Sequence, residues 1–119
     1  MAYDQNNIFA KIIQGEIPCD KVYEDDFSLA FRDISPKAKI HVLVIPKGMY
    51  TGFDDFTDNA SDKEKVGFST AVSKVIKQLN LSEKGCRLIS NLGNDGGQEV
   101  PHYHVHILGG ETLGALIGK

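Results

Sequence analysis

Short segments that favour β-strands, following one another closely along the chain, constrain the fold of these 119 residues more than any other feature. Turn residues or prolines separate the segments, and residues 40–45 are rich in β-branched side chains. The predicted strands cover residues 21–24, 28–32, 40–45, 86–90 and about 100–108. Because these strands come in adjacent, hairpin-sized pairs, and parallel strands would need longer crossovers, we expect an antiparallel sheet.

Two helices are expected beside this sheet. A short helix over residues 8–13 has apolar side chains at helical spacing and is ended by Gly15, with Pro18 following. A long helix begins at the capping-box sequence Ser61-Asp62-Lys63-Glu64, and residues 47–60 before it are expected to be irregular and acidic. The long helix carries a core-facing apolar stripe of Val66, Ala71, Val72, Val75, Ile76 and Leu79. One short and one long helix with a five-stranded antiparallel sheet make an α+β domain.

The length fits one domain, residues 1–119, with a polar N-terminal arm (1–7) and a C-terminal tail (111–119). A formal net charge of −3 argues against binding to a nucleic acid polymer, which depends on clustered Lys and Arg, but not against binding of one small nucleotide. The arm lacks the apolar core of a secretion signal, and no apolar run is long enough to cross a bilayer. We therefore expect a cytoplasmic protein without membrane contacts, in which Cys19 and Cys86 are free thiols.

Three of the four histidines, His102, His104 and His106, alternate within the last predicted strand. Alternate residues of a strand point to one face, so these imidazoles are expected to line one surface. The residues between them, Tyr103, Val105 and Ile107, would then pack into the core. A strand face made wholly of imidazoles is hard to explain by packing and indicates a functional site.

Imidazoles in this arrangement suit nucleophilic attack on phosphorus. The neutral ring is abundant near neutral pH and can form a covalent phosphorus–nitrogen intermediate that water then hydrolyses. The glycine-rich loop over residues 91–99 leads directly into the histidines, and such loops let backbone N–H groups approach phosphate oxygens. A zinc hydrolase is the competing interpretation, because H-x-H is also a zinc-ligand spacing. No acidic residue lies within the triad, so we expect no metal and no other cofactor.

The ordered motifs together resemble the histidine triad (HIT) family, and the resemblance covers nearly the whole chain. Its most specific part is His102-x-His104-x-His106 followed by Ile107-Leu108-Gly109-Gly110. Further matches lie in the opening helix with Glu16-Ile17-Pro18, in the central strands, and in the loop over residues 95–100. The chain is similar to the bacterial type of the branch of histidine triad nucleotide-binding proteins (the Hint branch) that hydrolyse purine nucleoside phosphoramidates.

The resemblance implies a role for each matching residue. His104 would be the nucleophile, His106 would bind the phosphate, and His102 and His41 would form a supporting layer. Asp33 would accept hydrogen bonds from the ribose hydroxyls. The phosphate and leaving-group side would be lined by Asn91, Gly97 and the backbone of Gln98 and Glu99. The apolar slot for the purine would be made by Ile8, Phe9, Ile12, Phe31 and Ile34.

The same resemblance implies an activity and a partner. The expected substrates are purine nucleoside 5'-phosphoramidates, with aminoacyl adenylates as a further class, and the product is a nucleotide such as AMP or GMP. A homodimer is implied in which two sheets join into one continuous ten-stranded sheet. The alternatives are a dinucleoside polyphosphate hydrolase, whose branch usually has a Pro-Arg-like segment where Leu108-Gly109-Gly110 stands here, and a nucleotide-sensing interaction protein.

The chain departs from its relatives at several positions. Relatives with a structural zinc carry a C-x-x-C pair where Asn7 and Ala10 stand, and many have a histidine near Gly48-Met49-Tyr50. Both departures argue against a zinc site. Animal relatives often have Ser where Glu99 stands and an aromatic residue where Pro101 stands, and their tails differ. The departures at Glu99, at Pro101 and in the tail therefore concern the leaving group and the choice of substrate.

Overall fold

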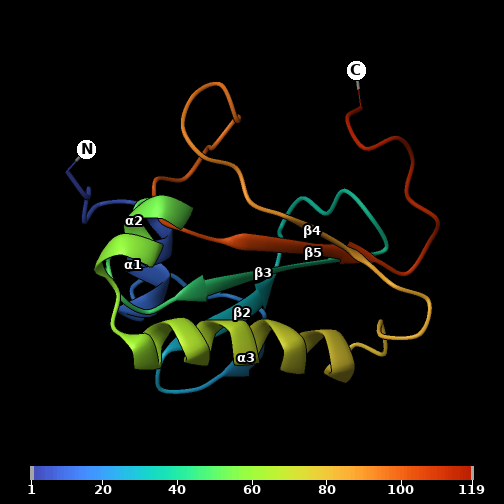
Figure 1. The fold of residues 1–119 in the computed structure, drawn as a ribbon, viewed down its shortest axis with the longest axis horizontal. Helices are drawn as coiled ribbons and strands as arrows, with labels where there is room; N and C mark the ends of the chain where they lie inside the picture. Colours follow the sequence, from blue (N-terminus) through green and yellow to red (C-terminus); the bar gives the residue numbers. More distant parts are fainter. Residues whose placement is uncertain (1, 119) are drawn as a thin grey trace.

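A computed structural model describes residues 2–118 as one five-stranded antiparallel sheet with three helices (Figure 1). The strands lie in the order β1-β2-β3-β5-β4, so the two central strands are β3 and β5. Their bounds are β1 Lys21–Glu24, β2 Ser28–Arg32, β3 Ile40–Pro46, β4 Arg87–Ile89 and β5 Val105–Gly109. The α+β class and the antiparallel sheet are thus confirmed. The first residue of the predicted arm, Met1, and the last residue of the predicted tail, Lys119, lie outside the described residues.

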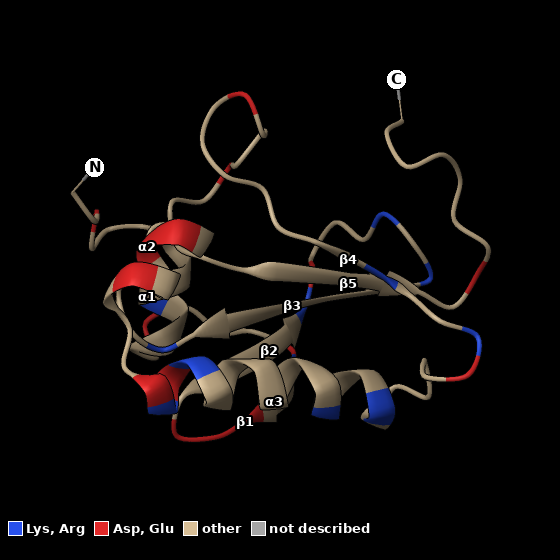
Figure 2. Cartoon of the chain, viewed as in Figure 1, with Lys and Arg blue, Asp and Glu red and all other residues tan. Residues whose placement is uncertain are grey.

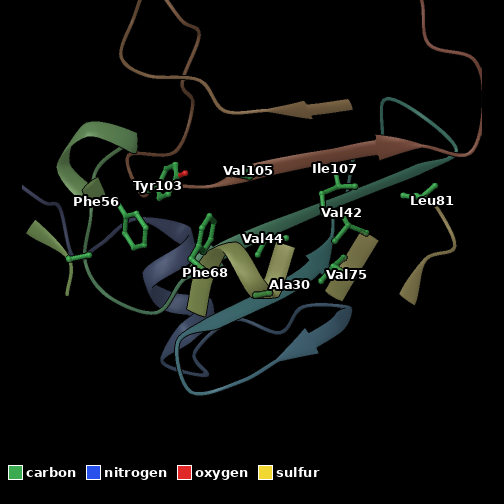
Figure 3. Packing of buried hydrophobic residues seen from close by; sticks show 12 residues of the cluster. Ala30, Val42, Val44, Phe56, Phe68, Val75, Leu81, Tyr103, Val105 and Ile107 are labelled. Carbon is green, nitrogen blue, oxygen red and sulfur yellow. The ribbon is translucent and has the colours of Figure 1, made fainter. Parts of the chain in front are cut away.

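Helices cover both faces of the sheet, and successive side chains of β3 point alternately to one face and the other. Val42 and Val44 point to the face under the long helix α3 (Asp62–Gln78), where Val75 and Ile107 join them in the larger core cluster (Figure 3). Leu43 and Ile45 point to the opposite face and pack with Phe9 of the short helix α1 (Ile8–Ile13). His41, two residues before Leu43, therefore lies on the α1 face.

Helix α3 begins where the capping box predicts. The Ser61 side chain accepts from the backbone of Glu64, and the Glu64 side chain accepts from the backbone of Ser61. Acidic residues occupy its first turn and Lys77 its last, an arrangement that complements the helix dipole (Figure 2). The prediction that Val66 belongs to the core-facing stripe is wrong. Val66 is 66% exposed, and Phe68 packs in the core instead.

The segment expected to be irregular contains a helix, α2 (Phe53–Asn59), which the sequence did not predict. Its N-cap is Gly52, which offers no side-chain acceptor, and Phe56 is its one buried residue. The signals that identify a helix in a sequence, a capping side chain and an apolar stripe, are therefore missing. Tertiary contacts stabilise it instead, because the Phe56 ring packs against Tyr50, Phe68 and Tyr103.

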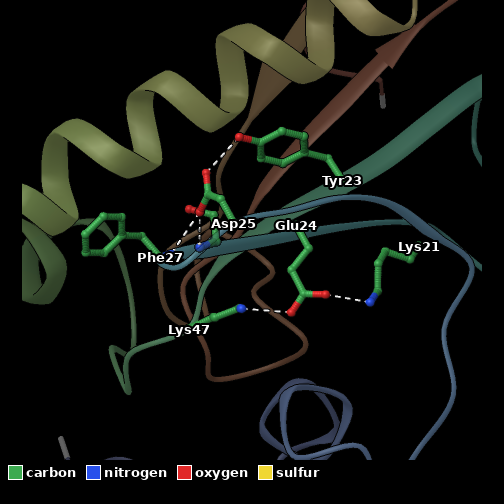
Figure 4. A network of polar contacts seen from close by, with 7 residues as sticks. Lys21, Tyr23, Glu24, Asp25, Phe27 and Lys47 are labelled. Carbon is green, nitrogen blue, oxygen red and sulfur yellow. Dashed lines mark hydrogen bonds and ion pairs between the residues drawn. The ribbon is translucent and has the colours of Figure 1, made fainter.

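The hairpin of β1 and β2 is held by side chains of its own turn (Figure 4). Asp25 accepts from the backbone nitrogens of Phe27 and Ser28, and from the Tyr23 hydroxyl. Glu24 pairs with Lys21 and Lys47, and these two partners lower its pKa to about 2. The Asp25 contacts therefore close the turn between β1 and β2, and the Glu24–Lys47 pair links β1 to the residue that follows β3.

Strand β5 starts later than predicted. It begins at Val105, so His102 and His104 precede the strand and do not share its regular alternation with His106. The cause is a change of backbone partner: Tyr103 N donates to Tyr50 O, 2.7 Å away, rather than to β3. Tyr103, Val105 and Ile107 nevertheless enter the core as expected.

The C-terminal tail folds back along the β4 side of the sheet. The Arg87 guanidinium donates to the carbonyls of Gly114 and Ala115, and Glu111 accepts from Lys39 N. Leu116 and Ile117 beyond these contacts are exposed. Among the residues that the structure describes, no helix is long and apolar enough to cross a membrane.

Candidate active site

A cleft of about 440 Å³ opens on the α1 face of the sheet, where three of the four histidines meet. Its walls come from α1, the segment after it, the ends of β2 and β3, the loop before the histidines, and β5. Of the residues predicted for the site, those that line this cleft are Ile8, Phe9, Ile12, Phe31, Asp33, Ile34, His41, Asn91, Gly97, Glu99, His104 and His106. The sequence thus identified most of the cleft. His102 and Gln98 are the two predicted residues that do not line it.

His104 presents one ring nitrogen to this cleft. Its Nδ1 lies 2.7 Å from the carbonyl oxygen of His102, and a carbonyl can only accept, so Nδ1 carries the proton. The ring is 5% exposed, and burial lowers its pKa, which keeps it neutral. A neutral imidazole protonated at Nδ1 has a lone pair on Nε2. His104 therefore has the electronic state that a nucleophile requires.

His102 lies behind the cleft. Its Nε2 donates to Pro46 O at 2.8 Å, and its Nδ1 lies 2.6 Å from the Tyr3 hydroxyl. The ring is fully buried, which lowers its pKa to about 4. The expectation that all three triad imidazoles share one surface is wrong for this residue, because the backbone before Val105 is not yet in the strand. Its position fits the predicted supporting layer.

His41 and His106 form a directed pair. Lys37 N donates to Nδ1 of His41, so His41 carries its proton on Nε2 and donates it to Nδ1 of His106 at 2.9 Å. Nε2 of His106 must then carry a proton, because Nδ1 is an acceptor. Burial, together with the neighbouring histidines, lowers the pKa of His106 to about 4. The cleft thus receives one imidazole acceptor, His104 Nε2, and one imidazole donor, His106 Nε2–H.

The Asp33 carboxylate lies beside His41. One carboxylate oxygen accepts from Ser35 N, and the other lies 3.5 Å from Nε2 of His41. The side chain remains partly exposed to the cleft, so it has acceptor capacity left for a ligand hydroxyl.

Within residues 2–118, Asp33, His41 and His106 also form a group whose side chains could hold a metal ion. Their ligand atoms lie within 4.8 Å of one another. The two histidine nitrogens, however, face each other across a hydrogen bond. An ion bound there would have to displace the proton that His41 shares with His106, so the two nitrogens as they stand are arranged as a hydrogen-bonded pair.

The apolar slot is partly core and partly open, because Phe9 and Phe31 are buried in the core cluster on this face of the sheet. Ile34 is 95% exposed and Ile8 is 42% exposed, although both line the cleft. These two isoleucines present exposed apolar surface at the cleft, which a bound ligand would cover. The slot also includes apolar or weakly polar residues that the sequence did not single out: Ile17, Pro18, Cys19, Leu43 and Val100.

Gln98 braces the loop instead of lining the cleft. Its amide nitrogen donates to Thr51 O and Val100 O, and its amide oxygen accepts from Gly93 N. Gly97 adopts a positive φ of 77°, a conformation that favours glycine. The Gln98 side chain therefore holds in place the loop that brings Asn91 and Glu99 to the cleft.

The sequence also missed Tyr3, which was assigned to a polar arm. Its partner His102 lies 99 residues away in the sequence. No local pattern could have linked the two residues, and the only signal was one aromatic residue within an otherwise polar segment.

Fold and site together define an α+β domain with a histidine-lined cleft on one face of its sheet, and comparison with known proteins identifies the family. The chain belongs to the HIT family, because the HIT domain model matches residues 14–113. It is 50% identical over 117 residues to an uncharacterized HIT-like protein of Azospirillum brasilense, covering 98% of this chain and 96% of that one. It is 44% identical over 114 residues to the purine nucleoside phosphoramidase of Escherichia coli, covering 95% and 94% of the two chains.

Solved structures agree with this assignment. The crystal structure of a HIT family hydrolase from Legionella pneumophila superposes with a TM-score of 0.87 at 42% identity. The superposition covers 95% of this chain and all of that one. The resemblance inferred from the sequence motifs is thus confirmed.

Proposed function

We propose that this protein hydrolyses the P–N bond of purine nucleoside 5'-phosphoramidates, with aminoacyl adenylates as a second substrate class. The observation that carries the proposal is the state of His104, a buried neutral imidazole whose unprotonated Nε2 faces the cleft. The E. coli relative, named a purine nucleoside phosphoramidase, supports the choice of substrate.

The proposed reaction proceeds in two displacements. Nε2 of His104 attacks phosphorus, a phosphorus–nitrogen bond to the ring forms, and the bond to the amine breaks as the amine leaves with a proton from solvent. Water then attacks the same phosphorus, and the bond to His104 breaks. The products are the nucleoside monophosphate and the amine. Nε2–H of His106 would donate to a phosphate oxygen and stabilise the charge that develops there.

The cleft offers matching positions for the rest of a nucleotide. The slot of Ile8, Phe9, Ile12, Phe31 and Ile34 would hold the purine by apolar contact. Asp33 would accept from the ribose hydroxyls. Asn91, Gly97 and Glu99 would contact the phosphate and leaving group from the opposite wall. His41 and His102 would act as positioning residues.

We further propose that two copies associate through the β4 edge. The outer side of β4 has no strand partner within residues 2–118, and an apolar groove runs beside it. The groove is lined by apolar side chains that include Phe53, Val72, Ile76, Leu88 and Tyr103. Phe53 is 58% exposed and Leu88 is 50% exposed. Antiparallel pairing of two β4 strands would join the sheets and cover this groove. Light scattering should give twice the chain mass, and Leu88→Asp should shift it to the monomer.

The direct test of the activity is His104→Ala with an adenosine phosphoramidate as substrate. The variant should lose at least about three orders of magnitude in kcat, as other covalent catalysts do without the nucleophile. Binding of AMP, measured by calorimetry, should persist because the slot and Asp33 remain. Near-normal turnover in this variant would refute the assignment of the nucleophile.

Two further assays separate the alternatives. A diadenosine polyphosphate should be turned over far more slowly than the phosphoramidate, and the opposite ranking would favour the polyphosphate hydrolase. A chelator should leave kcat unchanged, because the proposed mechanism uses no metal. Loss of activity that added zinc restores would instead support a metal-dependent hydrolase.

A further inference from the structure

The N-terminal arm is fastened to the start of helix α1 by a compact turn. The Asn7 side chain caps the helix by accepting from Ala10 N at 2.9 Å, and its amide nitrogen donates to Asp4 O at 2.7 Å. The backbone nitrogen of Asn7 also donates to Asp4 O, and Asn7 is buried. The turn therefore fixes the position from which Tyr3 extends.

From this position Tyr3 reaches His102. Its hydroxyl lies 2.6 Å from Nδ1, and the two rings meet edge to face with centroids 5.6 Å apart. Because Nε2 of the neutral His102 ring donates to Pro46 O, Nδ1 holds a lone pair and the tyrosine hydroxyl is the donor. Burial raises the pKa of Tyr3, so the hydroxyl keeps its proton.

His102 is thereby held at both ring nitrogens, and its backbone makes the next contact. Its carbonyl accepts Nδ1–H of His104 at 2.7 Å. Phe9 packs edge-on against both rings, with centroids 6.3 Å from His102 and 5.0 Å from His104. A continuous chain of contacts thus links the arm to the proposed nucleophile.

We propose that Tyr3 is a positioning residue for His104: its hydroxyl locks the His102 ring against Pro46, and this holds the His102 carbonyl where it selects the Nδ1–H tautomer of His104. The kinetic consequence rests on the proposed function, whereas the tautomer does not.

Removal of the hydroxyl would leave His102 Nδ1 buried without a donor, which is costly. The ring cannot solve this by moving its own proton, because Nε2 would then point a lone pair at Pro46 O. The ring and the backbone of residue 102 must shift instead. His104 would lose its fixed acceptor and would populate the Nε2–H tautomer, which is not nucleophilic at the cleft.

The experiment compares Tyr3→Phe with Tyr23→Phe in the full chain. Tyr23 also donates its hydroxyl at 2.8 Å, but to Asp25 in the β1–β2 turn, away from the cleft. For Tyr3→Phe we expect kcat on an adenosine phosphoramidate to fall about tenfold while KM changes less than about twofold. Nitrogen-15 NMR of the imidazoles should show Nδ1–H for His104 in the wild type and a mixture of tautomers in Tyr3→Phe. Tyr23→Phe should match the wild type in both measurements.

Each outcome decides the inference. If Tyr3→Phe lowers the melting temperature but leaves kcat and both histidine tautomers unchanged, Tyr3 has only a structural role and the inference is overturned. If the wild type does not hydrolyse phosphoramidates, the proposed function fails, yet the NMR comparison still tests the tautomer. Unchanged His104 resonances in Tyr3→Phe would overturn the inference in that case too.

Discussion

Nε2 of His41 lies 2.9 Å from Nδ1 of His106, and the proton in this contact belongs to His41. The direction follows from Lys37 N, which occupies the other nitrogen of His41 as a donor. The consequence is that His106 must present N–H to the cleft, where a phosphate oxygen would need it. His41 thus sets which nitrogen of His106 carries the proton, and so the polarity of the ring that would meet a phosphate.

Replacement of His41 tests this polarity. His41→Leu removes the donor and leaves Nδ1 of His106 unpaired, so His106 can carry its proton on either nitrogen. We expect kcat on a phosphoramidate to fall by about tenfold to a hundredfold. His41→Gln keeps an N–H donor and should lose clearly less. Equal losses in the two variants would contradict the donor role and leave only a packing role.

The pH dependence of activity follows from the state of His104. Attack requires its unprotonated Nε2, and burial lowers its pKa below the ordinary value of 6.5. The neutral form therefore persists as the pH falls through 6.5, and kcat/KM should stay level there and decline only in more acidic buffer. Steady-state rates should be corrected for spontaneous acid hydrolysis of the substrate. An acid limb at or above the ordinary histidine value would contradict this prediction.

The free energy of unfolding should also depend on pH, because burial lowers the pKa of His102. Its folded pKa of about 4 lies below its unfolded value near 6.5, so between these values the unfolded chain binds the extra proton. Stability from this residue is present above 6.5 and is lost as the pH falls toward 4, by about 2 kcal/mol between about pH 7 and pH 5. Urea unfolding at both pH values measures the loss. His102→Gln should show a smaller pH dependence, and an unchanged one would refute the assignment.

Local signals predicted the parts of the fold that local interactions stabilise. Strands β1 and β2 have the predicted bounds because Asp25 closes their turn with hydrogen bonds inside the hairpin. Helix α1 ends where Gly15, at a positive φ of 81°, follows its C-cap. Helix α2 escaped prediction because its stability comes from Phe56 in a distant aromatic cluster, not from a cap.

In the candidate site too, sequence patterns predicted some placements, and long-range contacts decided the others. His104 and His106 of the motif both line the cleft, but the strand that was expected to hold the triad begins only at Val105. The redirected backbone depends on a hydrogen bond from Tyr103 N to Tyr50 O, and these residues lie in loops 53 positions apart in the sequence. The backbone of Gln98 was assigned to the lining by resemblance, but Gln98 does not line the cleft, and its side-chain amide instead joins the loop to Thr51. Long-range partners decided each of these outcomes, and the sequence pattern does not encode them.

The cap of α3 offers a stability test that should leave the site untouched. Ser61→Ala removes the acceptor for Glu64 N and should lower the free energy of unfolding by about 1 kcal/mol. Ser61→Asp retains a capping oxygen and should cost much less. Both are measured by urea unfolding at one protein concentration, because association would change the apparent stability. A loss of phosphoramidate turnover in the folded Ser61→Ala protein would show that α3 acts on the site, contrary to expectation.

Asp33 offers a test of where the ribose binds. If its free carboxylate oxygen accepts from the sugar hydroxyls, the wild type should prefer an adenosine phosphoramidate over the 2'-deoxy analogue by about tenfold in kcat/KM. Asp33→Ala should lower both rates, because the carboxylate also lies 3.5 Å from His41, but it should abolish the preference between the two substrates. The ratio therefore isolates the ribose contact from the effect on His41. Asp26→Ala, which removes an exposed carboxylate from the β1–β2 turn, controls for the change in net charge and should keep the wild-type ratio. A preference that survives in Asp33→Ala would place the ribose against another wall of the cleft.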